Sequence, residues 1–244
     1  MKFKKFKNKL IPKDIELVTS ENSTSNTLVY IPWRDSYLDY VQEEFKDFFL
    51  QALPHLHVRT TDVHTAISLS YLDMLIALYN GKINRRVVAL GLILHDIGWA
   101  SLTEKDIIGS LSDYKGLELS SASLGPKERH VIEGVKVSRR ILDNYRFDPP
   151  LNVMEKQEIL DSVLYHDTME KLSENGKLVA DLDRLWSFTH ENFWQDTIRK
   201  NVEPDLYLKN LAVDSEKYFC TTAGLTLAKR LLRDREKEIE QSKK

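Results

Sequence analysis

Residues 92–99, in one-letter code LILHDIGW, place an imidazole and a carboxylate side by side at the end of an apolar run. Charged groups are costly to bury unless they are paired or bind a metal ion. Leu94 and His95 continue a helical pattern that starts after Asn84, and Gly98 is a residue type that commonly ends a helix. The stretch therefore predicts a buried helix, closed by Gly98, whose polar end needs a partner.

The rest of the chain also indicates helices. Apolar residues recur mostly at spacings of three and four, and only nine glycines and seven prolines interrupt 244 residues. We expect an all-α protein, a single helical bundle with N- and C-terminal extensions. Residues 1–30 are expected to have little regular structure, and Asn175-Gly176 to form a turn. Helices are expected at about 35–53, 61–81, 85–98, 127–145 and 153–166, from Leu178 onward, and from Glu216 to Lys244.

The chain is predicted to consist of three parts packed as one domain. These parts are residues 1–58 (extension and first helix), 59–188 (the main domain) and 189–244 (a helical extension). Residues 101–128 are rich in serine and contain one weak helical segment, TEKDIIGSLSDY. A loop of this length is either a lid or binding loop, or a surface connector without a further role.

Composition excludes several classes of partner. The formal net charge is -2, so no global field favours nucleic acid or an anionic membrane. Five lysines in the first ten residues form either a phosphate- or membrane-seeking tail or a solvated, frayed terminus. Cys220 is the only cysteine, which rules out an intrachain disulfide and favours a cytoplasmic protein. No apolar run approaches the ~20 residues of a membrane span, and we find no secretory signal.

Four histidines, His64, His95, His130 and His166, fall on four different predicted helices. The gaps between them are 31 to 36 residues, which corresponds to one helix and one connection. Four helices can therefore direct an imidazole to a common centre, as in bundles that hold metals in their cores. The alternative for each histidine alone is a boundary residue or a hydrogen-bonded core residue. His55, His57 and His190 are left out of the predicted centre.

Gly91 lies one helical turn before His95, and Gly134 one turn after His130. A glycine inside a helix costs about 1 kcal/mol relative to alanine. Each glycine either makes room beside an imidazole or permits close packing of two helices.

Acidic residues complete the pattern. Asp181 and Asp183 lie in VADLDRLW, whose apolar neighbours imply that one of the two carboxylates faces inward. Asp62 and Asp167 are close in sequence to His64 and His166, and either can orient a ligand by hydrogen bonding. Helix capping explains Asp62 equally well.

Over about residues 59–188 this pattern resembles the HD-domain superfamily of metal-dependent phosphohydrolases. The ordered ligands of that family are a histidine, a His-Asp pair and a distant aspartate, which correspond here to His64, His95-Asp96 and Asp183. Asp183 is preferred to Asp181 because DLDRL is similar to the closing motif of the family, and HDIG gives one subgroup its name. His130 and His166 resemble the two further ligands of members that hold two metal ions.

The resemblance implies a centre with one or two divalent ions. Asp96 is the expected bridge and catalytic carboxylate, with His64, His95 and Asp183 on one ion and His130 and His166 on the other. Imidazoles and carboxylates suit iron, manganese, cobalt, nickel or zinc better than magnesium. Lys127, Arg129 and Arg184 are the candidate substrate-binding residues, Arg129 first among them.

Two branches of the superfamily fit less well. The cyclic-dinucleotide phosphodiesterases usually have a lysine three residues after the motif aspartate and a downstream Gly-Tyr-Pro, whereas this chain has Trp99 and no GYP. The guanosine tetraphosphate hydrolases have a Glu-Asp pair that is not found here. The ligand spacing is more similar to dinuclear hydrolases of dinucleoside polyphosphates.

The expected function is hydrolysis of a phosphate ester or anhydride in a small molecule or nucleotide, with no nucleic-acid or membrane partner. Two alternatives stay open. One is a di-iron oxygenase acting on a small polar substrate, because some relatives with this ligand set use dioxygen. The other is a non-catalytic, metal-binding regulatory protein. The oligomeric state is not predicted.

Overall fold

The helix predicted from LILHDIGW is the buried centre of the molecule. In the computed structural model, which describes residues 3–6, 11–20, 29–111 and 125–243, this helix is α4 (Arg85–Leu94). The side chain of Asn84 caps its first turn by accepting hydrogen bonds from the Arg86 and Val87 amides, and residues 87–94 are all buried. The helix ends at Leu94, not at Gly98 as predicted, and a 3-10 helix, η4 (Ile97–Ser101), follows His95 and Asp96.

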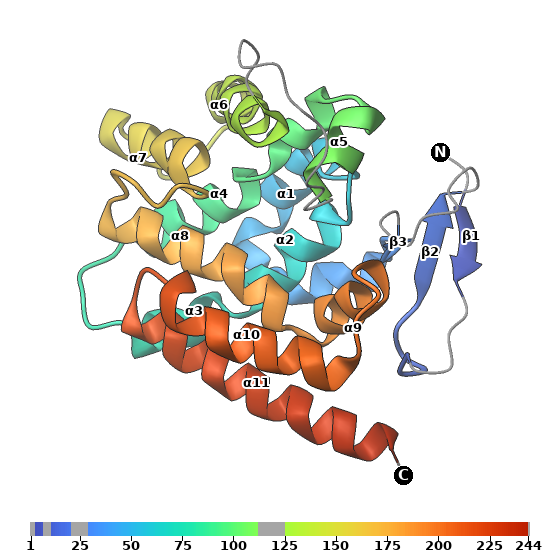
Figure 1. Cartoon of the computed structure of the whole chain (residues 1–244). Coiled ribbons are helices and arrows are strands. Elements are labelled where there is room, and N and C mark those ends of the chain that lie inside the picture. Colours follow the sequence, from blue (N-terminus) through green and yellow to red (C-terminus); the bar gives the residue numbers. More distant parts are fainter. Residues whose placement is uncertain (1–2, 7–10, 21–28, 112–124, 244) are drawn as a thin grey trace.

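The all-α fold class is confirmed, and the helices surround α4 in a bundle (Figure 1). No helix in the described part of the chain is both long and apolar enough to cross a membrane. The remaining helices are α1 (Glu43–Ala52), α2 (Thr61–Ser70), α3 (Leu72–Leu78), α5 (Glu104–Leu111), α6 (Pro126–Asn144), α7 (Val153–Tyr165), α8 (Glu174–Leu185), α9 (His190–Arg199), α10 (Pro204–Tyr218) and α11 (Thr222–Ser242), with 3-10 helices η2 (Asp35–Tyr40), η3 (Leu53–His55) and η5 (Trp186–Phe188).

Several predicted helix boundaries are wrong. The segment 61–81 forms two helices, α2 and α3, and the tail forms α10 and α11, separated at residues 219–221. The first α-helix starts at Glu43, after η2. Asn175 and Gly176 do not form a turn, because the Ser173 side chain accepts a hydrogen bond from the Gly176 amide and caps α8 there. Capping side chains, those of Ser173 and Thr221, thus mark the starts of α8 and α11, which apolar spacing alone placed incorrectly.

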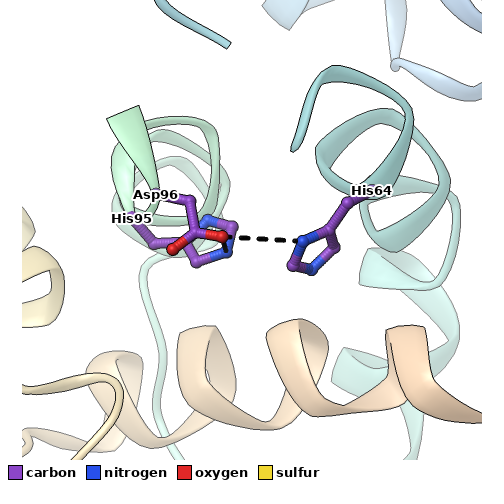
Figure 2. A group of neighbouring side chains, drawn as sticks. All are labelled: His64, His95 and Asp96. Atoms are coloured by element: carbon purple, nitrogen blue, oxygen red, sulfur yellow. Dashed lines mark ion pairs between the residues drawn. The ribbon is translucent and has the colours of Figure 1, made fainter. Parts of the chain in front are cut away.

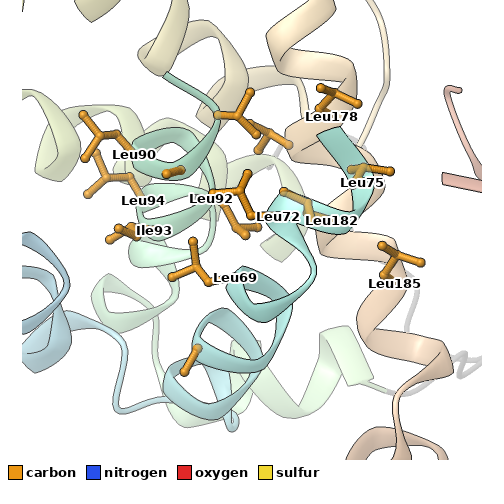
Figure 3. Packing of buried hydrophobic residues seen from close by; sticks show 14 of the residues in the cluster. Leu69, Leu72, Leu75, Leu90, Leu92, Ile93, Leu94, Leu178, Leu182 and Leu185 are labelled. Atoms are coloured by element: carbon orange, nitrogen blue, oxygen red, sulfur yellow. The ribbon is translucent and has the colours of Figure 1, made fainter. Parts of the chain in front are cut away.

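One hydrophobic core joins the central helices. Figure 3 shows leucines of α2 and α3 meeting those of α4 and α8, for example Leu69 and Leu72 with Leu92 and Leu182. Leu227, on α11, belongs to the same buried cluster. This packing fixes the relative positions of α2, α4 and α8, whose polar residues converge at one end of the bundle.

The N-terminal residues form a small sheet, which corrects the expectation of little regular structure. Strand β1 (Phe3–Phe6) pairs antiparallel with β2 (Leu17–Ser20), and β2 pairs antiparallel with β3 (Val29–Tyr30). Leu17 and Val29 are buried against Val63 and Ile67 of α2 and Ile198 of α9. The basic terminus is therefore not frayed at residues 3–6, while residues 1–2 and 7–10 lie outside the described part.

Gly91, Gly98 and Gly134 lie at close contacts between elements rather than beside imidazole rings. A Cβ on Gly91 would lie 2.9 Å from Val179 Cγ2, on α8, and one on Gly134 would lie 3.1 Å from Val163 Cγ1, on α7. A Cβ on Gly98 would overlap the His130 carbonyl oxygen and lie 2.5 Å from the Gly134 amide nitrogen, both on α6. Helix α6 and η4 therefore approach so closely that only glycine fits at position 98. The weak helix of the 101–128 segment is present as α5. The rest of the loop predicted there, either a lid or binding loop or a surface connector, lies largely in residues 112–124, outside the described residues.

Candidate metal centre

The six predicted ligands come together from five elements of the bundle. His64 lies in the first half of α2, His130 near the start of α6, and Asp183 in α8. His95 and Asp96 directly follow α4, and His166 directly follows α7. Figure 2 shows His64 facing His95 and Asp96 across the space between α2 and the end of α4. The helix ends thus place all six side chains around one point.

Asp96 lies between two pairs of histidines. Its Oδ2 atom is 3.7 Å from His64 Nδ1 and 3.6 Å from His95 Nε2. Its Oδ1 atom is 3.4 Å from His130 Nε2 and 3.6 Å from His166 Nε2. Each carboxylate oxygen therefore faces a different pair, which is the arrangement required of a carboxylate that bridges two ions.

Two further carboxylates border the histidines. Asp183 Oδ1 is 3.2 Å from His64 Nε2 and 3.3 Å from His95 Nε2. On the other side, Asp167 Oδ2 is 3.7 Å from His130 Nε2. The sequence suggested Asp167 only as a residue that orients His166. Its position beside both histidines makes it a candidate ligand as well.

The hydrogen bonds of the histidine rings leave nitrogen lone pairs available to bind a metal ion. His95 Nδ1 lies 2.6 Å from the Leu92 carbonyl oxygen, and His166 Nδ1 lies 2.9 Å from that of Val163. A carbonyl only accepts, so each Nδ1 carries the proton and the Nε2 lone pair of the neutral ring faces the centre. The Nε2 atoms of His64, His95 and His130 are buried without a hydrogen-bond partner among the described residues. Buried nitrogens without partners, next to carboxylates, fit a set of divalent-cation ligands.

The centre is also strongly coupled electrostatically. Burial alone would raise the pKa of Asp96, but its interactions with His95, His130 and His166 hold it well below its usual range. The pKa of Asp183 is lowered in the same way by His64 and His95. Burial disfavours the charged form of His166, and the nearby aspartates outweigh it and raise its pKa to about 9. A bound cation would replace these protons, because metal ligands must be deprotonated.

A polar pocket of about 500 Å³ opens over the centre. Of the three predicted substrate-binding residues, only Lys127 lines it. Arg129 pairs instead with Asp106 on α5. Arg184 is buried and donates a hydrogen bond to the His166 carbonyl oxygen at 2.9 Å, so it fixes the backbone that carries a ligand.

The pocket also contains basic residues that the sequence did not single out. Arg59, Arg199 and Lys200 all line it. Arg199 and Lys200 lie at the end of α9, in the segment that was treated as an extension, and both pair with Asp196. No motif marks these positions, because the fold alone brings residue 59 and residues 199–200 to the same wall.

The two aspartates of DLDRL have different environments. Asp183 faces the histidines, whereas Asp181 is fully buried on another side of α8. Asp181 accepts hydrogen bonds from the Cys220 amide at 2.6 Å and from the Thr221 amide at 3.1 Å. Burial raises the pKa of Asp181 to about 6, and these donors oppose the shift. Asp62 bonds to His57 at 2.7 Å, so it does not orient His64.

Comparisons with known proteins gave one match. A family model described as HD domain matches residues 63–186, which lie within the range 59–188 inferred from the motifs. The search of curated proteins gave no match. The search of solved structures gave none either.

Proposed function

The chain belongs to the HD-domain family, in which metal-dependent hydrolases predominate, and from this premise we propose that it is a metal-dependent phosphohydrolase. The proposed reaction is cleavage of a phosphate ester or anhydride in a small phosphorylated molecule or nucleotide. The proposed ligands are His64, His95, Asp96, His130, His166 and Asp183.

The position of Asp96 carries the proposal. Its Oδ1 and Oδ2 atoms face two separate histidine pairs at 3.4 to 3.7 Å, which supports a centre for two ions bridged by one carboxylate. When bound, two neighbouring divalent ions polarise a phosphoryl group and lower the pKa of a water molecule. The buried histidines fix the geometry, and the rest of the pocket must bind the substrate.

The charge of the pocket supports a phosphorylated substrate. Lys127, Arg59, Arg199 and Lys200 surround carboxylates that would be neutralised by bound cations. The remaining positive charge favours an anionic group over a neutral one. Arginine is particularly suited to phosphate because its planar guanidinium donates two parallel hydrogen bonds.

The same four imidazoles and carboxylates also suit iron. An oxygenase of the HD type is therefore the second candidate function. The two differ in what they consume: a phosphohydrolase releases phosphate or a phosphorylated product without dioxygen, whereas an oxygenase consumes dioxygen.

The test is metal analysis of protein purified with and without air, followed by a screen of phosphate esters, nucleotides and dinucleoside polyphosphates. We expect one to two divalent ions per chain and release of phosphate or of a phosphorylated product. Oxygen consumption is measured in parallel. Dioxygen-dependent turnover without hydrolysis of any phosphorylated compound would assign the oxygenase function.

The Asp96→Ala variant tests whether the hydrolytic activity depends on the metal centre. It should lose bound metal at one or both positions and all hydrolytic activity, because both histidine pairs lose their shared carboxylate. Full metal content and turnover in this variant would show that the activity belongs elsewhere.

A further inference from the structure

Trp99 has contacts that its place in the sequence did not predict. It stands three residues after Asp96 and is buried. Its indole Nε1–H donates a hydrogen bond to Asp96 Oδ1 at 2.9 Å. Its ring also stacks on His130, with centroids 4.1 Å apart and planes 12° apart. Trp99 therefore touches two of the proposed ligands on the same side of the centre.

Arg59 lies against the same indole. Its guanidinium carbon is 3.9 Å from the centroid of the Trp99 ring, within the range of a cation–π contact. Its Nε atom is buried without a hydrogen-bond partner among the described residues. Two other arginines of this region have carboxylate partners, since Arg199 pairs with Asp196 and Arg129 with Asp106.

The backbone that presents Arg59 is held in an unusual conformation. Arg59 and Thr60 both have positive φ, at 58° and 69°. Residues other than glycine rarely adopt this conformation, and strained backbone of this kind persists where surrounding contacts enforce it. Here the Thr60 hydroxyl accepts hydrogen bonds from the Ile31 amide and from Gln195 Nε2, both at 3.2 Å. The turn is therefore fixed from two sides before any ligand binds.

We propose that Arg59, stacked on Trp99, forms an oxyanion subsite at the metal centre that binds the phosphoryl group of the substrate. Arg59 makes the contact, and Trp99 is a positioning residue that holds the guanidinium beside Asp96 and His130. The inference depends on the proposed function only in naming the bound oxyanion as part of a substrate.

The experiment measures binding of inorganic phosphate to the full-length, metal-loaded protein by calorimetry, so that no turnover is required. Arg59→Gln should weaken binding roughly ten- to hundredfold, which is the range expected for the loss of charge-assisted hydrogen bonds. Arg59→Lys should recover only part of this affinity, because lysine cannot donate in a bidentate manner. Arg139→Gln is the control, because Arg139 is an exposed arginine of α6 that does not line the pocket, and it should bind phosphate as the unmodified protein does.

Two substitutions of Trp99 separate stacking from the bond to Asp96. Both Trp99→Phe and Trp99→Leu lose the N–H donor, but only Trp99→Leu loses the aromatic face. Trp99→Phe should keep phosphate affinity within a few-fold, whereas Trp99→Leu should approach the affinity of Arg59→Gln. The double variant Arg59→Gln/Trp99→Leu should bind phosphate no more weakly than Arg59→Gln alone, since both changes disrupt the same stacked Arg59–Trp99 pair.

The outcomes distinguish this inference from the proposed function. Unchanged phosphate affinity in both Arg59→Gln and Arg59→Lys, at unchanged metal content, overturns the subsite even if phosphate esters are hydrolysed. Equal affinities of Trp99→Phe and Trp99→Leu, or additive losses in the double variant, overturn the positioning role. Arg59-dependent phosphate binding without hydrolysis of any phosphate ester supports the subsite and contradicts the phosphohydrolase function.

Discussion

Asp181 and Asp183 show how two identical side chains, two positions apart on α8, take on different roles. Asp183 Oδ1 lies within 3.3 Å of two histidine nitrogens, while Asp181 binds the amides that precede α11. The order of residues alone required only that one of them face inward. Resemblance to a family motif selected Asp183, and the placement of the two carboxylates agrees with that choice.

Exchanging each aspartate for asparagine should therefore give opposite results. Asp183→Asn should lower the number of bound ions per chain, because the His64–His95 side loses its negative ligand. Asp181→Asn should keep the metal but lose about 1–3 kcal/mol of folding free energy, because buried amides lose an acceptor. Elemental analysis and urea unfolding measure the two effects, and loss of metal only in Asp181→Asn would reverse the assignment.

The place of a single residue in the candidate site could be predicted where a sequence motif contains that residue. It could not be predicted where only the folding of distant segments brings the residue to the site. The positions of His64, His95, His130 and His166 followed from one imidazole per helix at regular gaps. Arg59 had no such signal, because its role depends on a turn that is fixed by Ile31 and Gln195 from distant parts of the chain. Arg129, preferred from its position next to His130, is paired with Asp106 instead.

At the scale of elements, η4 and α6 pack backbone against backbone at Gly98. Gly98 stands opposite the His130 carbonyl and the Gly134 amide, so a methyl group there overlaps backbone rather than a movable side chain. Backbone of α6 would have to move, and His130 with it. The sequence suggested a helix end at Gly98, because glycine commonly ends helices, and gave no sign of the partner helix.

Gly98→Ala should therefore damage both folding and the metal centre. We expect a loss of several kcal/mol in folding free energy, beyond the 1–3 kcal/mol typical of overpacking, together with weaker metal binding. Gly176→Ala is the control, since its Cβ would meet side-chain atoms rather than backbone, those of Leu172 at 3.0 and 3.3 Å and of Ser162 at 3.3 Å, and alanine favours helix. Thermal unfolding with and without metal distinguishes them, and equal stability of the two variants would contradict the packing argument.

At the scale of the whole molecule, contacts between the two ends of the chain could not be predicted from the sequence. His190, at the start of α9, was left out of the predicted centre. It has another role, because its Nδ1 lies 2.9 Å from Glu238 Oε2 on α11 and its Nε2 lies 3.0 Å from Asp14 Oδ2. These partners are 48 and 176 residues away, so no local pattern could pair them.

This connection should make stability depend on pH. Burial disfavours the charged form of His190, but Glu238 and Asp14 outweigh it and raise its pKa above the ordinary value. A raised pKa means that the ion pair stabilises the fold fully below the unfolded-state pKa of about 6.5 and ceases to do so as pH rises through the folded-state value. His190→Gln should accordingly cost about 1 kcal/mol at pH 6 and clearly less at pH 9.

Urea unfolding of the two proteins at both pH values measures this difference, and the partner substitutions identify its source. Glu238→Gln should remove most of the pH-dependent part, because that carboxylate is half-buried between His190 and Arg235. Asp14→Asn should remove a smaller share of the pH dependence, since the Asp14 side chain is 72% exposed and its charge is screened by solvent. If His190→Gln costs the same at pH 6 and pH 9, the ring is neutral in the folded protein, its single N–H donates to only one of the two carboxylates, and the predicted ion pair is absent.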